Sequence, residues 1–223
     1  IAVFAFSPRS TPPLAATRIP VDRMRILSLA SAGDALVAGG ELGYLLRSTD
    51  AGKSWQVAKV DPERFATITD ANHGMAVGHE GQILRTVDGG QSWQELHFDE
   101  QDGSPLLDIR RLPSGDWLAV GAFGRALRSS DDGKTWQFWR VPGTEAEEPH
   151  LNALIPGADP DHWLLVGEHG LVMRSSDGGS TFEKFAEGPV LGLTFKEPYL
   201  VNSPTVKIID GVWHMWYMTG IKW

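Results

Sequence analysis

The chain has 223 residues, a formal net charge of −8 and no cysteine. Its length suits one all-β domain with a substantial core, and the lack of cysteine excludes disulfides, thiolate metal sites and cysteine nucleophiles. The negative charge would repel a phosphate backbone, so we expect no nucleic-acid partner, and the sequence has no apolar run long enough for membrane insertion.

The first segment, residues 1–6, has the sequence IAVFAF and precedes a stretch rich in proline, serine and arginine at residues 7–20. The apolar, β-prone composition of the segment predicts a strand, and the stretch after it predicts a linker. The segment is too short, and lacks the preceding charges, for an intact signal peptide. We therefore expect a trimmed or processed end.

An eight-residue motif, which we call the Asp box, then occurs four times. Its copies are STDAGKSW (48–55), TVDGGQSW (86–93), SSDDGKTW (129–136) and SSDGGSTF (175–182). Their aspartates are 38, 43 and 46 residues apart, and each copy follows a stretch of the form G-x-x-G-x-φ-φ-R, where φ is apolar. A fixed period of about 40 residues is typical of a propeller blade.

Each Asp box predicts a tight turn that ends in a buried aromatic residue. We expect the aspartate to accept backbone N–H bonds across its own turn, the glycine to adopt the left-handed conformation and the aromatic ring to point into the core. We assign a structural role to the residues Asp50, Gly52, Trp55, Asp88, Gly90, Trp93, Asp131, Gly133, Trp136, Asp177, Gly179 and Phe182.

The flanks of the boxes predict four strands per repeat. Apolar runs at residues 35–38, 75–77, 117–120 and 163–166 precede the G-x-x-G turns, and a strand ending in arginine follows each turn. The aromatic residue of the box starts a further strand, and β-rich runs lie ahead of each pair at residues 26–30, 65–69, 106–109 and 151–155. Four strands in each repeat predict a four-stranded blade.

These motifs resemble Asp-box, or BNR, propellers, and residues 75–93 are most similar to the photosystem II stability/assembly factor-like family. The resemblance covers residues 12–195. It implies a β-propeller with a protein-binding or assembly role, an unidentified protein partner and an extracytoplasmic location. Asp boxes also occur in sialidases, secreted hydrolases and sorting receptors, so the motif alone does not specify an activity.

The C-terminal segment departs from this repeat. A fifth box is due about one period after Asp177, but residues 196–223 instead resemble a blade hairpin of five-bladed glycoside hydrolases. Asp210 and Gly211 lie between apolar runs and predict its turn. The change near Lys196 leaves engineering, natural recombination and a sequencing artefact open, and we favour an engineered or recombined hybrid.

We predict an all-β fold, a single β-propeller domain of five four-stranded blades. The expected blades are residues 21–62, 63–103, 104–147, 148–188, and 189–223 together with 1–6. In the fifth blade, residues 190–195, 205–209 and 212–218 supply three strands, and residues 1–6 return as the outer strand. Pairing of N- and C-terminal strands would close the ring and protect its edges.

Five arginines are candidate ligand-binding residues. Arg47, Arg85, Arg128 and Arg174 occupy the same position in the four repeats and could form a ring that reads acidic ligands. They also keep register with the box, which favours a role in the fold, such as bonding a carbonyl or stacking on an aromatic. Arg18 lies in an Arg-Ile-Pro sequence that resembles the carboxylate-binding motif of sialidases, but we favour the simpler interpretation, a short X-Pro linker before the first strand.

No complete catalytic constellation is visible, so we expect no enzymatic activity. A sialidase needs a tyrosine nucleophile paired with a glutamate, and Tyr44 instead occupies a repeat position held elsewhere by other residue types. A glycosidase needs two carboxylates facing each other. The C-terminal segment has Asn202 where related blades often carry an acid, and it places Glu197 in a loop and Asp210 in a turn.

The histidines predict neither a metal site nor a cofactor site. His79-Glu80 and Glu168-His169 occupy matching turns, but alternate blades would point these turns apart. We therefore predict a monomeric, non-catalytic propeller that acts as a scaffold or protein-binding module, or a hybrid propeller without an evolved activity. The alternative is a carbohydrate-active protein that binds glycans or acts as a glycoside hydrolase or sialidase.

Overall fold

The computed structural model describes residues 24–62, 68–72, 74–144, 148–185, 200–209 and 212–220. For residues 68–72 and most of 200–220 it describes the backbone alone. This part of the chain consists of β-strands, turns and short 3-10 helices, and it contains no helix long and apolar enough to cross a membrane.

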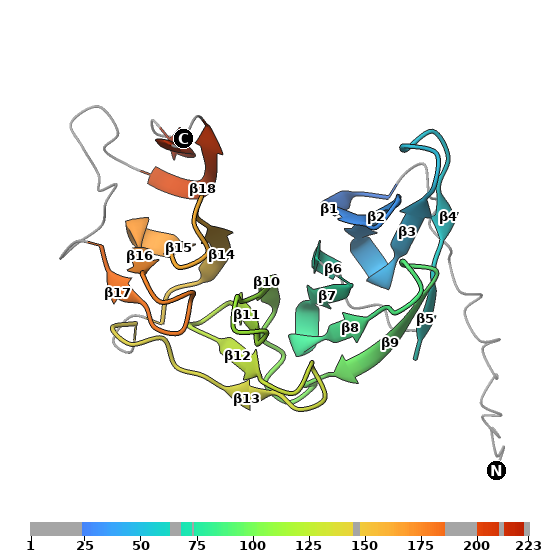
Figure 1. Ribbon diagram of the computed structural model, residues 1–223, viewed down its shortest axis with the longest axis horizontal. Coiled ribbons are helices and arrows are strands. Elements are labelled where there is room, and N and C mark those ends of the chain that lie inside the picture. Colours follow the sequence, from blue (N-terminus) through green and yellow to red (C-terminus); the bar gives the residue numbers. More distant parts are fainter. Residues whose placement is uncertain are drawn as a thin grey trace, which may run out of the picture.

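Four sheets follow one another along the chain, and each contains four antiparallel strands in sequence order, which form a blade (Figure 1). Blade 1 contains β1 (Ile26–Ala32), β2 (Ala35–Gly40), β3 (Leu45–Ser48) and β4 (Gln56–Val57), and blade 2 contains β6 (Ile68–Asn72), β7 (Met75–Gly78), β8 (Ile83–Arg85) and β9 (Ser92–His97). Blade 3 contains β10 (Leu106–Arg111), β11 (Trp117–Gly121), β12 (Ala126–Ser129) and β13 (Gln137–Phe138), and blade 4 contains β14 (Leu151–Pro156), β15 (Trp163–Gly167), β16 (Val172–Ser175) and β17 (Glu183–Lys184).

The blades are arranged as an arc (Figure 1). The first strands of the blades line its inner side and contact each other in the order β1, β6, β10 and β14. A further strand, β5 (Lys59–Asp61), leaves blade 1 and pairs in parallel with β9 on the outer edge of blade 2. This added strand links the two blades by backbone hydrogen bonds.

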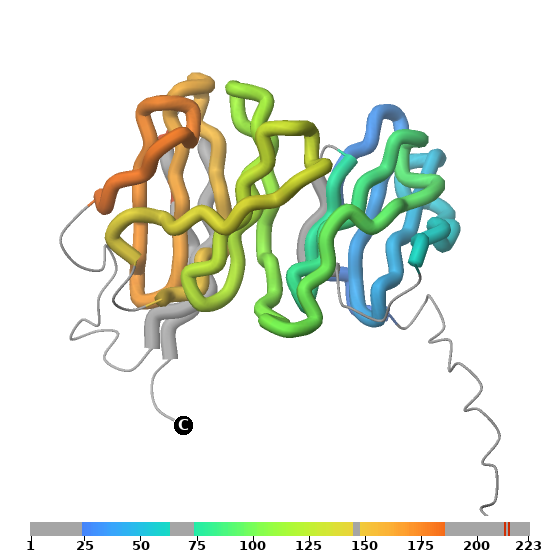
Figure 2. The backbone as a smooth tube through the Cα atoms, turned by 90° about the horizontal axis from the view of Figure 1, so that it is seen from below, coloured from blue at the N-terminus to red at the C-terminus, as the bar shows by residue number. Residues whose placement is uncertain are grey.

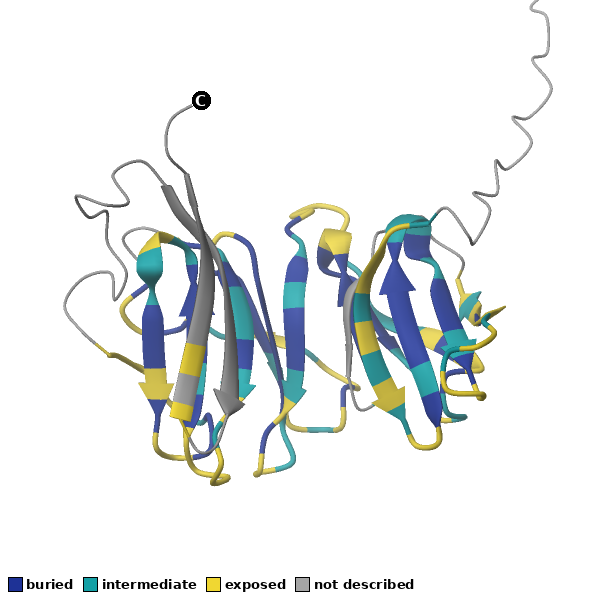
Figure 3. Cartoon of the chain, turned by 90° about the horizontal axis from the view of Figure 1, so that it is seen from above, coloured by how far each residue is buried: buried dark blue, intermediate teal, exposed yellow. Residues whose placement is uncertain are grey.

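Among the described residues, the hydrophobic core forms three clusters, and each lies between two adjacent blades. Blades 1 and 2 share a cluster around Val37 and Trp93, blades 2 and 3 share one around Met75 and Ile109, and blades 3 and 4 share one that contains Leu154. Buried residues therefore concentrate in the strands, and exposed residues concentrate in the turns (Figure 3). Burial between sheets is the main source of stability in such a fold.

The prediction of five blades is wrong, because only four four-stranded blades are present among the described residues. After blade 4 these residues form a two-stranded hairpin, β18 (Leu200–Ile209) and β19 (Val212–Gly220). The second strand of the expected blade was to start at Thr205. Instead β18 continues back past Pro204, because a register shift between Asn202 and Thr205 accommodates the proline. The other expected strands, at residues 1–6 and 190–195, lie outside the described residues.

No described blade covers one face of blade 1, at the start of the arc. The register of β1, β10 and β14 against their neighbours makes Leu29 equivalent to Ile109 and Leu154. Ile109 and Leu154 are 0% exposed, whereas Leu29 is 62% exposed. The same contrast holds at the start of these strands, where Ile26 is 44% exposed and its equivalents, Leu106 and Leu151, are 0% exposed. In these three strands, the inner positions are buried where a described blade precedes them and exposed where none does.

The strand order divides the connections between two rims of the arc (Figure 2). Turns between the second and third strands, together with the connections from blade to blade, form what we call the GxxG rim. The Asp boxes and the turns between the first and second strands form the opposite Asp-box rim, at the top of Figure 2. The two rims present different chemistry to solvent.

Candidate binding site on the GxxG rim

The four G-x-x-G turns share a strained backbone. The third residue of each turn has a left-handed conformation, with φ between 55° and 57°, and the glycine after it has φ between 63° and 74°. The strained positions are Leu42, Glu80, Phe123 and His169. A side chain in this region is uncommon and costs free energy, so each of these residues is held at its turn by the surrounding blade.

The first glycine of each turn is needed for a different reason. Gly40, Gly121 and Gly167 pair with the first residues of the inner strands. A Cβ atom on Gly121 would lie 2.2 Å from the Pro105 carbonyl oxygen, and one on Gly40 or Gly167 would lie 2.5 Å from a carbonyl oxygen. Close approach of two backbones, rather than a positive φ, therefore requires glycine here.

Arg125 connects the turn of blade 3 to the loop that precedes β10. It is only 7% exposed, and it forms ion pairs with Asp99 (2.8 Å) and with Asp102. The hydrogen bond from Arg125 lowers the pKa of Asp99, so the aspartate stays charged beside the guanidinium. Ser104 donates a hydrogen bond to Asp102. The cluster fixes the loop against blade 3.

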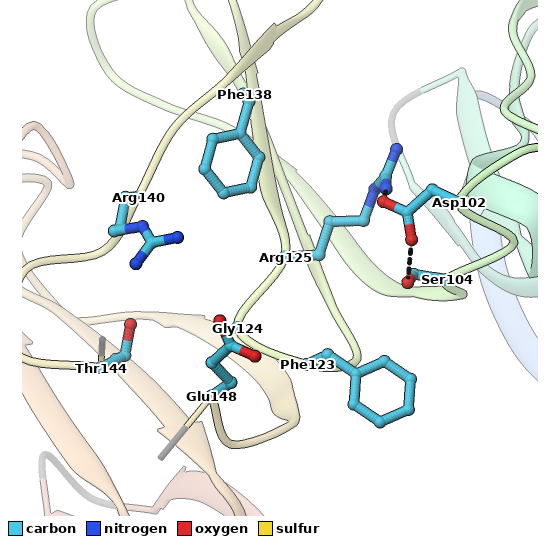
Figure 4. Close-up of a pocket in the computed structure, with 9 residues that line it drawn as sticks. All are labelled: Asp102, Ser104, Phe123, Gly124, Arg125, Phe138, Arg140, Thr144 and Glu148. Atoms are coloured by element: carbon cyan, nitrogen blue, oxygen red, sulfur yellow. Dashed lines mark hydrogen bonds and ion pairs between the residues drawn. The ribbon is translucent and has the colours of Figure 1, made fainter. Parts of the chain in front are cut away.

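A cavity of about 260 Å³ lies beside this cluster (Figure 4). Phe123 and Phe138 border it, and they are 60% and 59% exposed. Arg140 and Glu148 project into it from the connection between blades 3 and 4 (Figure 4). The lining therefore combines two aromatic rings with charges of both signs, as expected of a site that orients a ligand with a few polar groups.

Phe123 also contacts blade 4. Its ring meets the ring of His150 edge-on, with 4.8 Å between the centroids. His150 Nδ1 lies 3.5 Å from Glu168, and its backbone N–H donates to the same carboxylate at 3.2 Å. These contacts support the aromatic ring from one side while leaving its outer face exposed.

The remaining turn histidines do not converge on a metal. Glu168 is engaged by His150, and His79-Glu80 lies in η3 (His79–Gly81) of blade 2, whereas His169 lies in η4 (Glu168–Gly170) of blade 4. Within the described parts of the chain, no group of three or more histidine, aspartate or glutamate side chains is placed to hold a metal ion.

The Asp-box turns lie on the opposite rim and share one hydrogen-bond network. In blade 1, the Ser48 hydroxyl donates to Asp50 (2.8 Å) and accepts from the Gly52 N–H (2.9 Å). Ser54 donates to the same carboxylate through its backbone N–H (2.8 Å) and its hydroxyl (2.6 Å). The other three boxes repeat these four bonds at 2.6–2.9 Å.

These hydrogen bonds keep the box carboxylates ionised. Donation from Ser54 and Ser48 lowers the pKa of Asp50 to about 2, and donation from Ser92 and Thr135 does the same for Asp88 and Asp131. At Asp177 burial opposes the shift, but the hydrogen bonds outweigh it and the pKa is again about 2. The carboxylates are occupied by their own turns, which supports the structural role predicted for them.

The box aromatics differ in burial. Trp93 is 3% exposed and Phe182 is 5% exposed, and both belong to clusters between blades. Trp55 and Trp136 are partly buried, and their indole N–H groups donate to Gly52 and Gly133 of their own boxes. The buried indole nitrogen of Trp93 has no hydrogen-bond partner among the described residues.

Three of the four repeated arginines bridge adjacent blades. Arg47 donates to the carbonyl of Gly89 (2.7 Å), Arg85 donates to the carbonyl of Asp132 (3.0 Å), and Arg128 donates to the carbonyl of Ser180 (3.4 Å). Each acceptor lies in the Asp box of the next blade. The side chains therefore do not form a converging ring for a ligand, and their contacts favour the role in the fold.

Arg174 is the exception among these four. It pairs instead with Glu183 of its own blade (2.8 Å), and both side chains are exposed. Its guanidinium also lies over the Phe185 ring at 5.9 Å. Arg18, the fifth candidate, and Glu197 and Asp210 lie outside the described residues, so their predicted roles stay predictions.

Sequence reasoning missed the cavity residues. The repeat carries one usable signal: Arg125 is a charged residue at a position where other blades have Tyr44, Gln82 or Leu171. Its burial implies partners, and these lie in the connection from blade 2. Arg140 and Glu148 lie outside the repeated motif, so the pattern offers no indication of their location.

No protein-family profile and no curated protein sequence matches the chain. Virginiamycin B lyase from Staphylococcus aureus has a similar structure, with a TM-score of 0.61 and 14% identity over 87% of this chain and 62% of that chain. An ancestral GH74 enzyme gives a TM-score of 0.55 and 14% identity over 73% of this chain and 24% of that chain.

The structure of YCF48 from Cyanidioschyzon merolae is 17% identical over 88% of this chain and 81% of that chain. Its TM-score of 0.46 is too low to carry an argument about function. At these identities, the likeness concerns the fold, and activity has to be argued from the site itself. The comparisons and the strand topology together identify the chain as a β-propeller protein.

Proposed function

We propose that the chain is a non-catalytic, protein-binding β-propeller module and that its partner binds at the cavity of blade 3. The observation that carries this proposal is the pair of exposed rings, Phe123 and Phe138, at the border of one cavity. Aromatic residues that fill or line pockets supply much of the affinity of protein interfaces. Exposed apolar groups on a soluble protein promote unwanted association unless they serve binding, so two such rings beside a cavity indicate a binding surface.

Preorganisation of Phe123 supports a binding role. Its backbone is held at φ 55°, and its ring is supported by His150. The equivalent positions of the other blades carry Leu42, Glu80 and His169, so the turn does not require an aromatic residue. A ring that is already fixed loses little conformational entropy when a partner covers it.

The chemistry of the cavity supports a non-catalytic role. Asp99 and Asp102 are both paired with Arg125, and the pKa of Asp99 is lowered rather than raised. A general acid at neutral pH needs a raised pKa, as in glycosidases with two opposed carboxyl groups. The aspartates of this cluster are therefore better suited to fixing the loop than to transferring protons.

Glycan binding is the second candidate. Exposed aromatic faces and charged hydrogen-bonding groups around a small cavity would also suit a sugar ring. Both exposed rings here are phenylalanines, which offer no hydroxyl or indole N–H to a sugar. Arg140 and Glu148 line the cavity and make no ion pair with any described side chain, which favours a charged peptide over a neutral glycan.

Selection from a random peptide library on the purified chain tests the proposal, with a glycan array and a chromogenic glycoside panel alongside. We expect selected peptides to bind the native chain and to lose at least tenfold in affinity on Phe138→Ser. The matched control is Phe185→Ser. Phe185 is 55% exposed and lies under an arginine at 5.9 Å, as Phe138 does, but it is not part of the cavity.

Peptides that bind equally well to both variants would place the binding surface elsewhere. Glycan binding or glycoside cleavage without any peptide binding would contradict the proposal and favour the second candidate. A loss of peptide binding in Phe138→Ser is interpretable only if the variant and the native chain have the same melting temperature. Since the side chain is mostly exposed, we expect that it does.

A further inference from the structure

A strand from blade 1 extends the outer edge of blade 2. β5 pairs in parallel with residues 92–94 at the start of β9, so the sheet of blade 2 contains five strands, whereas the other three blades contain four. The Lys59 N–H donates to the carbonyl of Gln91 at 3.0 Å, and Val60 lies opposite Trp93. Main-chain bonds of this kind let an exposed sheet edge take up a further strand.

The side chains of β5 divide between the core and solvent. Val60 is partly buried and packs against the cluster that contains Trp93, whereas Lys59 and Asp61 are exposed. With this strand in place, the Trp93 ring is only 3% exposed. The edge of blade 2 therefore accepts an extended segment with one apolar side chain between two polar ones.

Blade 3 presents the same edge without an added strand. Its Asp box aligns residues 135–137 with residues 92–94, but no described strand lies beyond β13 (Figure 1). Trp136 is only partly buried there, although it packs against the cluster between blades 2 and 3. Lys134 is the equivalent of Gln91, and no described backbone N–H donates to its carbonyl. The groups that bind β5 on blade 2 are therefore available on blade 3.

The connection from blade 2 to blade 3 takes a different course from β5. After β9 it turns to the G-x-x-G turn of its own blade, where the Asp99 N–H donates to Glu80 (2.8 Å). On blade 4, by contrast, the preceding connection covers the box aromatic, because Trp139 and Val141 pack with Phe182, which is 5% exposed. Among the described blades, only blade 3 combines a preceding blade with a box aromatic that remains partly exposed.

We propose that the outer edge of blade 3 binds an extended segment of the protein partner as a parallel fifth strand, in the register of β5 on blade 2. The N–H of the first segment residue donates to the carbonyl of Lys134, and the second segment residue covers Trp136. This inference rests on the proposed protein-binding function and specifies how the partner is bound.

The parallel direction leads the segment to the cavity. β13 follows the Asp box and runs toward the GxxG rim, where Phe138 borders the cavity. Successive residues of a strand alternate between its two faces, so Trp136 and Phe138 share one face, and the second and fourth segment residues point to the same side. The site therefore selects a polar-apolar-polar-apolar segment, whose last residue packs on Phe138. The main-chain bonds add affinity that does not depend on sequence.

Disulfide capture tests the register, because the native chain contains no cysteine. The variant Gln137→Cys places a thiol opposite the third segment residue, as Gln94 lies opposite Asp61. The probes are the blocked hexapeptides Ser-Thr-Val-Cys-Leu-Ser and Ser-Cys-Val-Thr-Leu-Ser, whose four central residues represent the segment. In a thiol exchange buffer, we expect the first probe to give about tenfold more mixed disulfide than the second at equilibrium, measured by mass spectrometry.

Gln56→Cys is the matched control. Gln56 is exposed and also follows a box tryptophan, but it lies on blade 1, which no described blade precedes. We expect neither probe to be preferred there. Equal capture of both probes at Gln137→Cys would mean that the register is wrong, and preference for the second probe would indicate an antiparallel segment. Either result overturns the proposal.

Methylation of single backbone nitrogens in the captured probe tests the main-chain bonds. Adjacent residues of a strand direct their N–H groups to opposite sides, so the first segment residue faces blade 3 and the second faces solvent. Methylation at the first residue should reduce capture by about tenfold, whereas methylation at the second should change it little. Equal effects at both positions would show that the segment does not bind as a strand.

The outcomes separate this inference from the proposed function. If library peptides require Phe138 but the probes show no preferred register, strand addition is wrong and protein binding stands. If the first probe is captured in register but library peptides bind equally to Phe138→Ser, strand addition stands and the cavity is the wrong site. If the native chain elutes as a dimer and captures the probe only after dilution to the monomer, a second copy occupies this edge and the inference is wrong. If neither probes nor library peptides bind, both proposals are wrong.

Discussion

Alanine at Gly90 should destabilise the protein far more than alanine at Gly52, although both glycines occupy the same position of the Asp box. Their backbones are equivalent, with φ of 84° and 85°. A Cβ atom on Gly90 would lie 2.6 Å from Val37 Cγ2 of the preceding blade, whereas one on Gly52 would meet nothing closer than 3.7 Å. The difference between the two variants therefore measures the clash with the preceding blade, because the backbone strain of alanine at a positive φ is the same in both.

The expected free energies follow from these distances. Both substitutions place a side chain in the left-handed region, which costs about 1–2 kcal/mol. Gly90→Ala adds an overpacking cost of about 1–3 kcal/mol, because Val37 is β-branched and cannot rotate its methyl group away freely. At Gly133 the contact is the flexible end of Met75, 2.7 Å away, so we expect an intermediate value.

Urea unfolding of the three variants measures these differences. The order of destabilisation should be Gly90→Ala, then Gly133→Ala, then Gly52→Ala. Equal losses at Gly90 and Gly52 would mean that the box does not pack against the preceding blade. The proposed organisation of the core between blades would then be wrong.

Three further predictions concern the same network. Trp93→Ala should cost about 3–5 kcal/mol in the free energy of unfolding, since the ring is buried between blades 1 and 2, and a thermal melt matching the native chain would contradict this. Arg85→Lys should lower the melting temperature more than Arg174→Lys, because only Arg85 bonds the next blade, and equal shifts would contradict the bridging role. Hydrogen bonds lower the pKa of Asp88 to about 2, so its stabilising contribution is complete above its unfolded pKa near 4 and is lost as the pH falls through 2. In Asp88→Asn, the melting temperature should therefore fall less between about pH 4 and 2 than in the native chain. An unchanged dependence of the melting temperature on pH would refute this prediction.

The sequence specified the repeated parts of this structure well. The period of the Asp boxes and the alternation around them predicted the four strands of each blade, because local turn chemistry and apolar runs determine these elements. The arginine register predicted a role in the fold, but not the acceptor, since the acceptor lies in the next blade. Contacts between repeats depend on the rotation from blade to blade, which the sequence pattern does not contain.

The count of blades and the site were harder to predict. Residues 200–220 could supply two strands of a fifth blade, and only the pairing of β18 with β19 showed that no further described strand joins them. The cavity brings together a G-x-x-G turn, the end of β13 and two connections between blades. Connections have no repeated pattern, so Arg140 and Glu148 gave no signal.

Unfolding of the matched variants Leu29→Ala and Leu154→Ala tests the central claim, that packing between successive blades organises the protein and leaves blade 1 uncovered. Both residues occupy the same position of an inner strand, but Leu154 is 0% exposed and Leu29 is 62% exposed. We expect Leu154→Ala to cost about 2–5 kcal/mol and Leu29→Ala to cost less than about 1 kcal/mol. Equal, large losses in both variants would mean that another blade covers blade 1 in solution and would contradict the open four-bladed arc.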